Sequence, residues 1–130
     1  MNTFTALAAP AGRLLISLMF VTSGLSKITG YAATQGYMEA MGVPGMLLPL
    51  VIAVEVLGGL AVILGWHTRI AAFLLAGFSL LSAFLFHANF GDQMQMIMFM
   101  KNVAIAGGFL MIVSQGAGAF SLDNRNKSGG

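Results

Sequence analysis

The sequence predicts an all-α integral membrane protein, a bundle of four transmembrane helices with both termini in the cytoplasm. Three observations lead to this fold class. Hydrophobic residues make up 58% of the chain and charged residues only 8%, and the mean hydropathy is +0.88. The apolar residues gather in four blocks, each near the roughly 20 residues that a helix needs to cross a bilayer. Soluble domains carry about 25% charged residues, so these values exclude a soluble enzyme.

The four apolar blocks and their connections define the organisation of the chain. We expect a single membrane domain over residues 1–114, with spans at 11–28, 46–65, 70–87 and 94–114. Pro49 is tolerable in the second span because it falls in the first helical turn, where its missing N–H would have no partner. The connection from Gly30 to Gly45 carries two tyrosines, so we expect a short amphipathic segment at the membrane interface. Polar residues then replace the apolar run, and residues 115–130 are predicted to form a largely disordered cytoplasmic tail.

The distribution of basic residues predicts the orientation in the membrane. Cytoplasmic flanks of membrane helices are enriched in Lys and Arg. Arg13, Arg69, Arg125 and Lys127 lie on one predicted side, and Lys27 lies alone on the other. We therefore expect both termini in the cytoplasm and Arg13 as a flank anchor. If the membrane is the inner membrane of a bacterium, the connection from Gly30 to Gly45 then faces the periplasm. The net charge of +2 comes from 6 basic and 4 acidic side chains, so the expected partner is the lipid bilayer and not nucleic acid.

The composition also excludes several chemistries. The chain has no cysteine, so thiol–disulfide exchange, thiolate metal sites and Cys-held iron–sulfur clusters are excluded. No metal site is predicted from the remaining residues. The methionines at 94, 96, 98 and 100 alternate with period two, which scatters them around a helix, whereas a copper site needs them on one face. His67 and His87 fall at opposite predicted membrane ends, so they cannot share one metal ion.

Ionisable side chains inside the spans need an explanation, because each costs a few kcal/mol in lipid unless it has a partner or reaches water. Glu55 lies roughly 13 Å inside its helix at a rise of 1.5 Å per residue, and Gly58 and Gly59 on the same face allow a neighbouring helix to approach it. Lys101 lies about 10 Å from the outer end of the fourth span. A pair between Glu55 and Lys101 is therefore expected. It could be a packing device or a site for protons or anions.

The first span carries a seam at alternating spacings of four and three, formed by Arg13, Ser17, Phe20, Gly24 and Lys27. Seams of polar and small residues like this one are expected to face inward, while the larger apolar side chains meet lipid. His87 ends the third span at a level similar to that of the other ionisable groups. The predicted polar site near the outer leaflet, with candidate roles in ligand binding or proton handling, comprises Lys27, Glu55, His87, Lys101 and Asn102.

The order and spacing of several short segments resemble the DoxX family of small bacterial inner-membrane proteins with four transmembrane helices. The resemblance covers nearly the full chain. It rests on Arg13, Ser23-Gly24-Leu25-Ser26-Lys27, Gly42-Val43-Pro44, Glu55-Val56-Leu57-Gly58-Gly59-Leu60, Gly65, Thr68-Arg69-Ile70-Ala71-Ala72, Phe84-Leu85-Phe86-His87, Phe99-Met100-Lys101-Asn102 and Gly107-Gly108.

The resemblance implies a role near quinone-linked redox chemistry, because the family takes its name from a subunit of an archaeal thiosulfate:quinone oxidoreductase. Other members look like partners of thiol or peroxide stress systems. Since this chain has no cysteine, electron transfer would need a bound quinone or an oxidoreductase partner protein that carries the redox centre.

Three functions remain open at the level of sequence. The polar site could bind an oxygen-rich ligand such as a quinone headgroup, with Lys101 and His87 donating hydrogen bonds and Glu55 exchanging protons. The same residues could instead hold the helices of a non-catalytic anchoring subunit together. A small transporter component is less favoured, because four short helices leave little room for a pathway unless the chain forms a homo-oligomer.

Overall fold

The computed structural model describes residues 3–87 and 89–124, and within them the chain is helical without strands. Four segments are long and apolar enough to cross a membrane: α1, the segment Gly45–Leu64, α5 and α6. The four-span fold class is therefore confirmed. The elements are α1 (Thr3–Thr29), α2 (Tyr31–Ala40), η1 (Gly45–Leu47), α3 (Leu48–Ala53), η2 (Val54–Gly58), α4 (Gly59–Leu64), α5 (Thr68–Phe86) and α6 (Gln93–Gln115).

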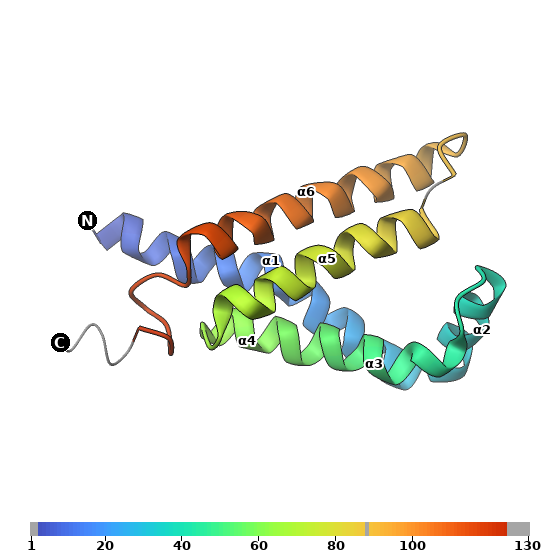
Figure 1. Ribbon diagram of the computed structural model, residues 1–130, viewed down its shortest axis with the longest axis horizontal. Helices are drawn as coiled ribbons and strands as arrows, with labels where there is room; N and C mark the ends of the chain where they lie inside the picture. Colours follow the sequence, from blue (N-terminus) through green and yellow to red (C-terminus); the bar gives the residue numbers. More distant parts are fainter. Residues whose placement is uncertain (1–2, 88, 125–130) are drawn as a thin grey trace.

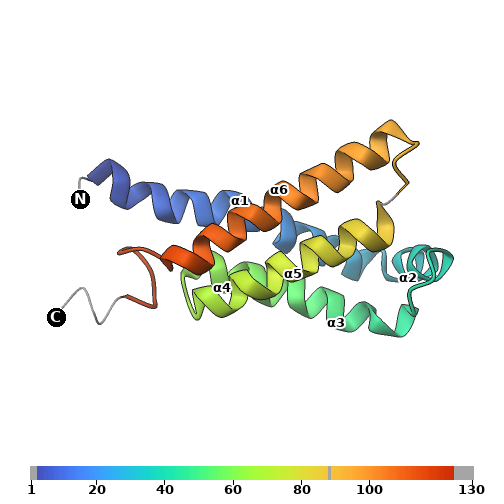
Figure 2. The same ribbon diagram turned by 45° about the horizontal axis from the view of Figure 1, so that its top comes forward.

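The helices form two layers that cross each other, and each layer is a pair of antiparallel spans (Figures 1 and 2). The helices α5 and α6 lie side by side along most of their length, and the run from α3 through η2 to α4 packs against α1. The short helix α2 lies at the end of the molecule remote from the beginning of α1 and the end of α6. The first and last spans therefore begin and end on the same side, as an even number of crossings requires.

The inward seam predicted for the first span is confirmed. The buried residues of α1 are Arg13, Ser17, Phe20 and Gly24, and they share one helix face because their spacing of three and four residues follows the helical repeat. Phe20 contacts Phe109 of α6 edge to face at 5.5 Å between ring centroids. The helix begins at Thr3, well before the predicted residue 11, because the preceding stretch is rich in alanine, the residue with the highest helix propensity.

The second span contains a π-helical segment that hydropathy alone cannot reveal. The span opens with the 3₁₀ turn η1, carries Pro49 in the first turn of α3, and widens over Val54–Gly58 before α4 resumes. Glu55 lies inside this π segment. Wide turns of this kind expose backbone groups and redirect side chains, and they are frequent at functional sites.

Arg13 is an internal capping residue, so its predicted role as an anchor at the membrane flank is wrong. Its side chain is buried, with 2% exposed. One guanidinium nitrogen, Nη1, donates to the carbonyl oxygens of Val62 at 3.0 Å and Ile63 at 2.9 Å, and Nη2 donates to the carbonyl oxygen of Phe120. The last turn of a helix leaves carbonyls without helical partners. Arg13 supplies a donor to the Ile63 carbonyl and a second donor to the Val62 carbonyl, which also accepts from the backbone N–H of Gly65 at 3.1 Å. The long guanidinium stays inside because these acceptors lie next to α1.

The chain after α6 returns to the bundle over residues 116–124, where the sequence predicts a largely disordered tail. Leu122 and Asp123 donate their backbone N–H groups to Leu64 and Gly65. The Asp123 carboxylate accepts hydrogen bonds from the backbone N–H groups of His67 at 2.7 Å and Thr68 at 2.9 Å and from the Thr68 hydroxyl at 2.6 Å. It thereby caps the N-terminus of α5, where N–H groups lack helical partners. Residues 125–130 of the predicted tail lie outside the described residues.

Gly65 is required at the turn that the tail covers. Its φ is +73°, a conformation that is costly for residues with a Cβ. A Cβ at this position would also strike the Cβ of Ser121 and Nη1 of Arg13. The absence of a side chain therefore lets the tail, the turn and the arginine meet.

The environment of Asp123 lowers the pKa of its carboxyl group below the ordinary value. Burial is the largest single influence and raises this pKa, but hydrogen bonds from the Thr68 side chain, the Thr68 and His67 backbones, and the nearby His67 together outweigh it. A carboxyl group whose pKa is lower in the folded state stabilises that state above its unfolded pKa of about 3.9, and this contribution disappears as the pH falls through the folded pKa.

We predict that Asp123→Asn lowers the thermal midpoint of the solubilised protein at pH 7, because the cap of α5 loses its charge. The loss should be about 1 kcal/mol, the usual value of a helix cap, and solvent screening at this exposed site keeps it small. The difference from wild type should be full above about pH 4 and should shrink as the pH falls from there toward the lower, folded pKa of Asp123. Thermal unfolding between pH 3 and pH 8 measures this. Glu39→Gln removes a carboxylate at the other end and serves as the control.

We predict that Arg13→Met destabilises the protein by about 2 kcal/mol, because the carbonyls of Ile63 and Phe120 lose the donor that Arg13 supplies. Arg69→Met is the matched control, since Arg69 is exposed and makes one long bond, 3.5 Å, to the carbonyl oxygen of Ser114. Thermal unfolding in one detergent compares the two variants. Equal midpoints for the two variants would contradict the capping role.

Candidate functional site

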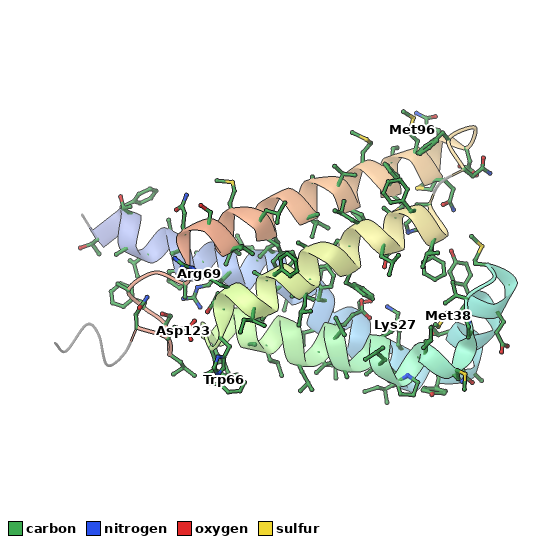
Figure 3. The ribbon with its side chains drawn as sticks, viewed as in Figure 1. Lys27, Met38, Trp66, Arg69, Met96 and Asp123 are labelled. Atoms are coloured by element: carbon green, nitrogen blue, oxygen red, sulfur yellow. The ribbon has the colours of Figure 1, made fainter. Side chains whose placement is uncertain are left out.

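A cavity of about 460 Å³ lies between the two layers, near α2 and away from the tail. Figure 3 shows its residues Lys27 and Met38 at the opposite end of the molecule from Arg69 and Asp123. Most of its wall is apolar. Its lining includes all five residues of the predicted polar site, which are Lys27, Glu55, His87, Lys101 and Asn102. These residues come from α1, η2, the end of α5 and α6, so the fold brings four separate segments to one space.

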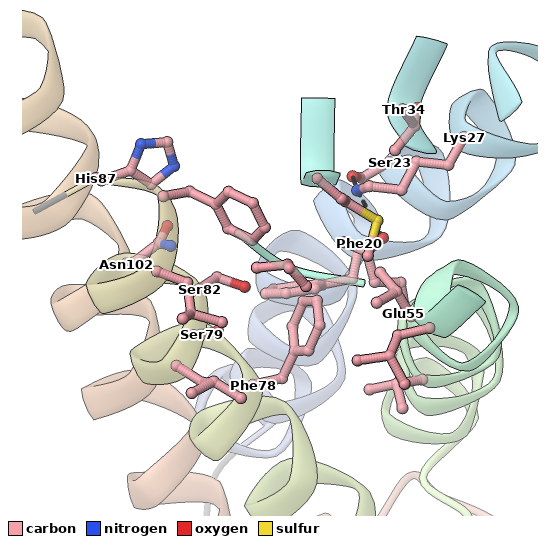
Figure 4. A pocket seen from close by; sticks show the side chains of 18 of the residues that line it. Phe20, Ser23, Lys27, Thr34, Glu55, Phe78, Ser79, Ser82, His87 and Asn102 are labelled. Carbon is pink, nitrogen blue, oxygen red and sulfur yellow. Dashed lines mark hydrogen bonds and ion pairs between the residues drawn. The ribbon is translucent and has the colours of Figure 1, made fainter. Parts of the chain in front are cut away.

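One wall of the cavity holds an ion pair (Figure 4). Nζ of Lys27 lies 2.7 Å from Oε1 of Glu55 and also donates to the hydroxyl oxygen of Ser23 at 2.7 Å. The Glu55 side chain is 5% exposed and that of Lys27 is 25% exposed. The expected partner of Glu55 was Lys101, and this expectation is wrong. Lys27 takes that place because it lies on the face of α1 that contacts η2.

Gly24 is the reason that α1 comes close enough to η2 for this pair. A Cβ at Gly24 would lie 2.5 Å from Cγ2 of Val56 and 3.2 Å from Cβ of Glu55, distances at which neighbours have to move. Lys27 follows Gly24 by almost one helical turn and so extends along the same face. The sequence therefore held a signal for the Lys27–Glu55 pair in Gly24, which lies about one helical turn before Lys27.

The opposite wall is polar but uncharged over α5 and the buried side of α6. Figure 4 shows His87, Ser82, Ser79 and Asn102 across the cavity from Lys27 and Glu55, with Phe20 and Phe78 between them. Nδ1 of His87 lies 2.9 Å from Oε1 of Gln95. An amide oxygen only accepts hydrogen bonds, so Nδ1 of His87 donates in this contact.

Lys101 lies on the rim of the cavity. Its side chain is exposed while the adjacent Asn102 is buried, since neighbouring residues of a helix point in different directions. The hydrogen bond described for its Nζ is a weak one to Sδ of Met98 at 3.8 Å. Within residues 3–87 and 89–124 Lys101 takes part in no salt bridge.

Helix α2 supplies a wall that the sequence reasoning did not assign to the site. Thr34, Tyr37 and Met38 line the cavity, and the Tyr37 ring stacks on Phe86 of α5 at 5.4 Å between centroids. Nε2 of Gln35 donates to the carbonyl oxygen of Gly45 and fixes α2 against η1. The two tyrosines predict a segment at the membrane interface, but only the fold shows that this segment lines the cavity.

The lining suits an organic ligand better than a metal ion. Across the described ranges, no three His, Asp or Glu side chains gather where they could hold a metal. A few polar groups set in a mostly apolar wall are typical of sites for small organic molecules, and the volume falls in the usual range of about 300–1,000 Å³.

Comparison with known proteins agrees with this architecture. The family model described as DoxX matches residues 8–88. This chain belongs to the DoxX family. It is 57% identical over 111 residues to Inner membrane protein YqjF of Escherichia coli (strain K12), with 85% of each chain covered. It is 38% identical over 120 residues to Inner membrane protein YphA of the same organism, with 87% of this chain and 86% of the relative covered.

A third relative of this DoxX protein carries a functional name. CatD of Bacillus subtilis (strain 168), named as a candidate oxidoreductase, is 33% identical over 64 residues, which cover 49% of this chain and 48% of CatD. No solved structure matches the chain. The family membership and the four apolar helices make this a multi-pass protein of the inner membrane.

We predict that Gly24→Ala lowers the thermal stability of the DoxX protein by about 1–3 kcal/mol, because the added methyl group forces α1 away from η2. Gly12→Ala is the matched control in the same helix, since a Cβ there has no neighbour within 4 Å. The control should be neutral or slightly stabilising, because alanine favours the helix. Thermal unfolding of both variants in one detergent tests this, and equal losses would contradict the close approach.

Proposed function

We propose that this DoxX protein binds a lipophilic, oxygen-bearing molecule in the cavity, with a quinone headgroup as the candidate, and acts as a membrane subunit in quinone-linked redox or oxidative-stress chemistry. The observation that carries the proposal is the convergence of Lys27, Glu55, His87, Lys101 and Asn102 on one apolar cavity. Ionisable groups are rare in membrane spans, and they usually mark a pathway or a functional site.

The cavity residues suit a flat ring that carries oxygen atoms. The rings of Phe20, Phe78 and Phe86 line the space and offer aromatic faces and edges to a planar ligand. Asn102 can donate an amide N–H, and Lys101 can donate from its ammonium group. Asn102 lies across the cavity from the Lys27–Glu55 pair (Figure 4), so a ring between the walls would have polar groups on two sides.

The protein residues would bind the ligand and move protons. A bound quinone would supply the electron chemistry, which a chain without cysteine needs from a cofactor or a partner. Glu55 is the carboxylate in the cavity wall that can accept or release a proton, and Lys27 at 2.7 Å holds it in place. His87 on the opposite wall (Figure 4) would be a second side chain that can exchange a proton.

The likeness to CatD supports a redox role, since that relative is named as a candidate oxidoreductase. The basic residues Arg13 and Arg69 lie at the end of the molecule remote from the cavity, and the positive-inside rule assigns that end to the cytoplasm. We therefore propose cytoplasmic termini and a cavity in the outer leaflet.

We predict that the protein, purified gently from its own membranes, retains quinone, and that Glu55→Gln and Asn102→Leu each reduce the retained amount about tenfold. A tenfold loss corresponds to about 1.4 kcal/mol, within the range of one polar contact. Extraction followed by mass spectrometry measures the quinone per protein. Glu39→Gln, a carboxylate outside the cavity wall, is the control, and a thermal midpoint is recorded for every preparation.

The same experiment tests the structural alternative, in which the ion pair only holds α1 to η2. In that case wild-type protein carries no quinone. The single variant Glu55→Gln is less stable than wild type, because removing one partner leaves a buried charge unpaired. The double variant Lys27→Met with Glu55→Gln recovers part of the lost stability. Quinone retained equally by wild type and both cavity variants contradicts the proposed site.

A further inference from the structure

We infer that the preferred ligand of the cavity is a lipophilic anion, a molecule with one acidic oxygen headgroup, carboxylate or phosphate, on an apolar body, and that Lys101 binds the headgroup. The inference rests on the proposed function, since it names the ligand class of the same cavity. The observations that carry it are the charges of the lining and the positions of the other acids of the chain.

The charges that line the cavity do not balance. Two ammonium groups, Lys27 and Lys101, and one carboxylate, Glu55, are part of the lining. Nζ of Lys27 lies 2.7 Å from Oε1 of Glu55, so these two charges neutralise each other. Lys101 is left with a weak contact to a thioether sulfur at 3.8 Å. The lining therefore carries one positive charge without a counterion in the described chain.

No other acidic side chain can balance Lys101. The chain has 4 acidic residues, and all of them lie in the described ranges. The Asp92 carboxylate caps its own helix by accepting from the backbone N–H groups of Met94 and Gln95. Asp123 caps α5 near the tail, and Glu39 is an exposed residue of α2 that does not line the cavity.

The groups next to Lys101 favour a negative oxygen. Asn102 follows it in α6, is 9% exposed and lines the same cavity, and its amide can donate an N–H. Ser82 adds a hydroxyl donor on the same wall. An ammonium group and neutral donors bind a carboxylate or phosphate oxygen by charge-assisted hydrogen bonds, which are about twice as strong as neutral ones.

The rest of the cavity favours an apolar body. Its remaining wall consists mainly of aliphatic, aromatic and methionine side chains, among them Met19, Leu50, Val54, Phe78 and Leu85. Lys101 is exposed, whereas Phe20 in the same lining is buried and Phe78 is partly buried. The ligand would therefore place its acidic group at Lys101 and its hydrocarbon part against these rings.

The test compares dodecanoate with dodecan-1-ol, which have the same chain but differ in charge. The full-length protein is placed in nanodiscs of zwitterionic lipid, and bound ligand is counted by native mass spectrometry against the total ligand concentration. Wild type should reach half occupancy with dodecanoate at a concentration about tenfold lower than with dodecan-1-ol. Lys101→Met should abolish this preference, and Lys101→Arg, which keeps the charge, should retain it. Arg69→Met, at the other end of the molecule, should behave as wild type.

Equal binding of the two compounds by wild type, or a preference for dodecanoate that survives Lys101→Met, would overturn the inference. If the protein retains quinone but binds dodecanoate no better than dodecan-1-ol, the inference of an anionic ligand is wrong while the proposed quinone site stands. If neither quinone nor the acid binds, both fail. Anionic phosphatidylglycerol added to the discs identifies the source of the headgroup: competition with dodecanoate indicates a lipid phosphate, and no competition indicates a free acid.

Discussion

Lipid cannot solvate a charge, and this constraint governs the arrangement of the DoxX protein around Glu55. A carboxylate inside a membrane span needs a cation or several donors within hydrogen-bond distance. Lys27 meets the need at 2.7 Å, but only because Gly24 brings α1 against the π segment of the second span. This contact sets how α1 crosses the second span and where the cavity wall with Lys27 and Glu55 lies.

The two ends of the bundle satisfy their polar groups in different ways. At the end with the tail, Arg13 donates to helix-terminal carbonyls and Asp123 accepts from helix-terminal N–H groups, so polar backbone atoms find partners inside the chain. At the end with α2, the polar side chains line a space, and Lys101 forms no salt bridge with any acid in the described part of the chain. The first arrangement is closed and stabilising, whereas the second leaves hydrogen-bonding capacity for a ligand.

The cavity joins two kinds of binding surface. Aromatic and aliphatic side chains provide an apolar interior, and the polar groups lie on opposing walls (Figure 4). An ion pair on one wall and neutral donors beside an unpaired ammonium on the other make the walls chemically different. A ligand with one polar headgroup would therefore bind in a single orientation, with its headgroup at the wall that has free donors.

Composition and periodicity were sufficient for the fold class, because lipid requires about 20 apolar residues in each crossing and forces polar residues onto inward faces. The same logic identified the α1 seam and the five residues that line the cavity.

The pairing of these residues could not be predicted. The depth of a residue along its helix does not tell which residue of another helix lies beside it. Only the tertiary structure shows that Lys27, and not Lys101, lies beside Glu55. The π turn, the role of Arg13 and the docked residues 116–124 depend on backbone hydrogen bonds between distant segments. Such bonds leave no periodic signal in the sequence, so only the assembled fold decided them.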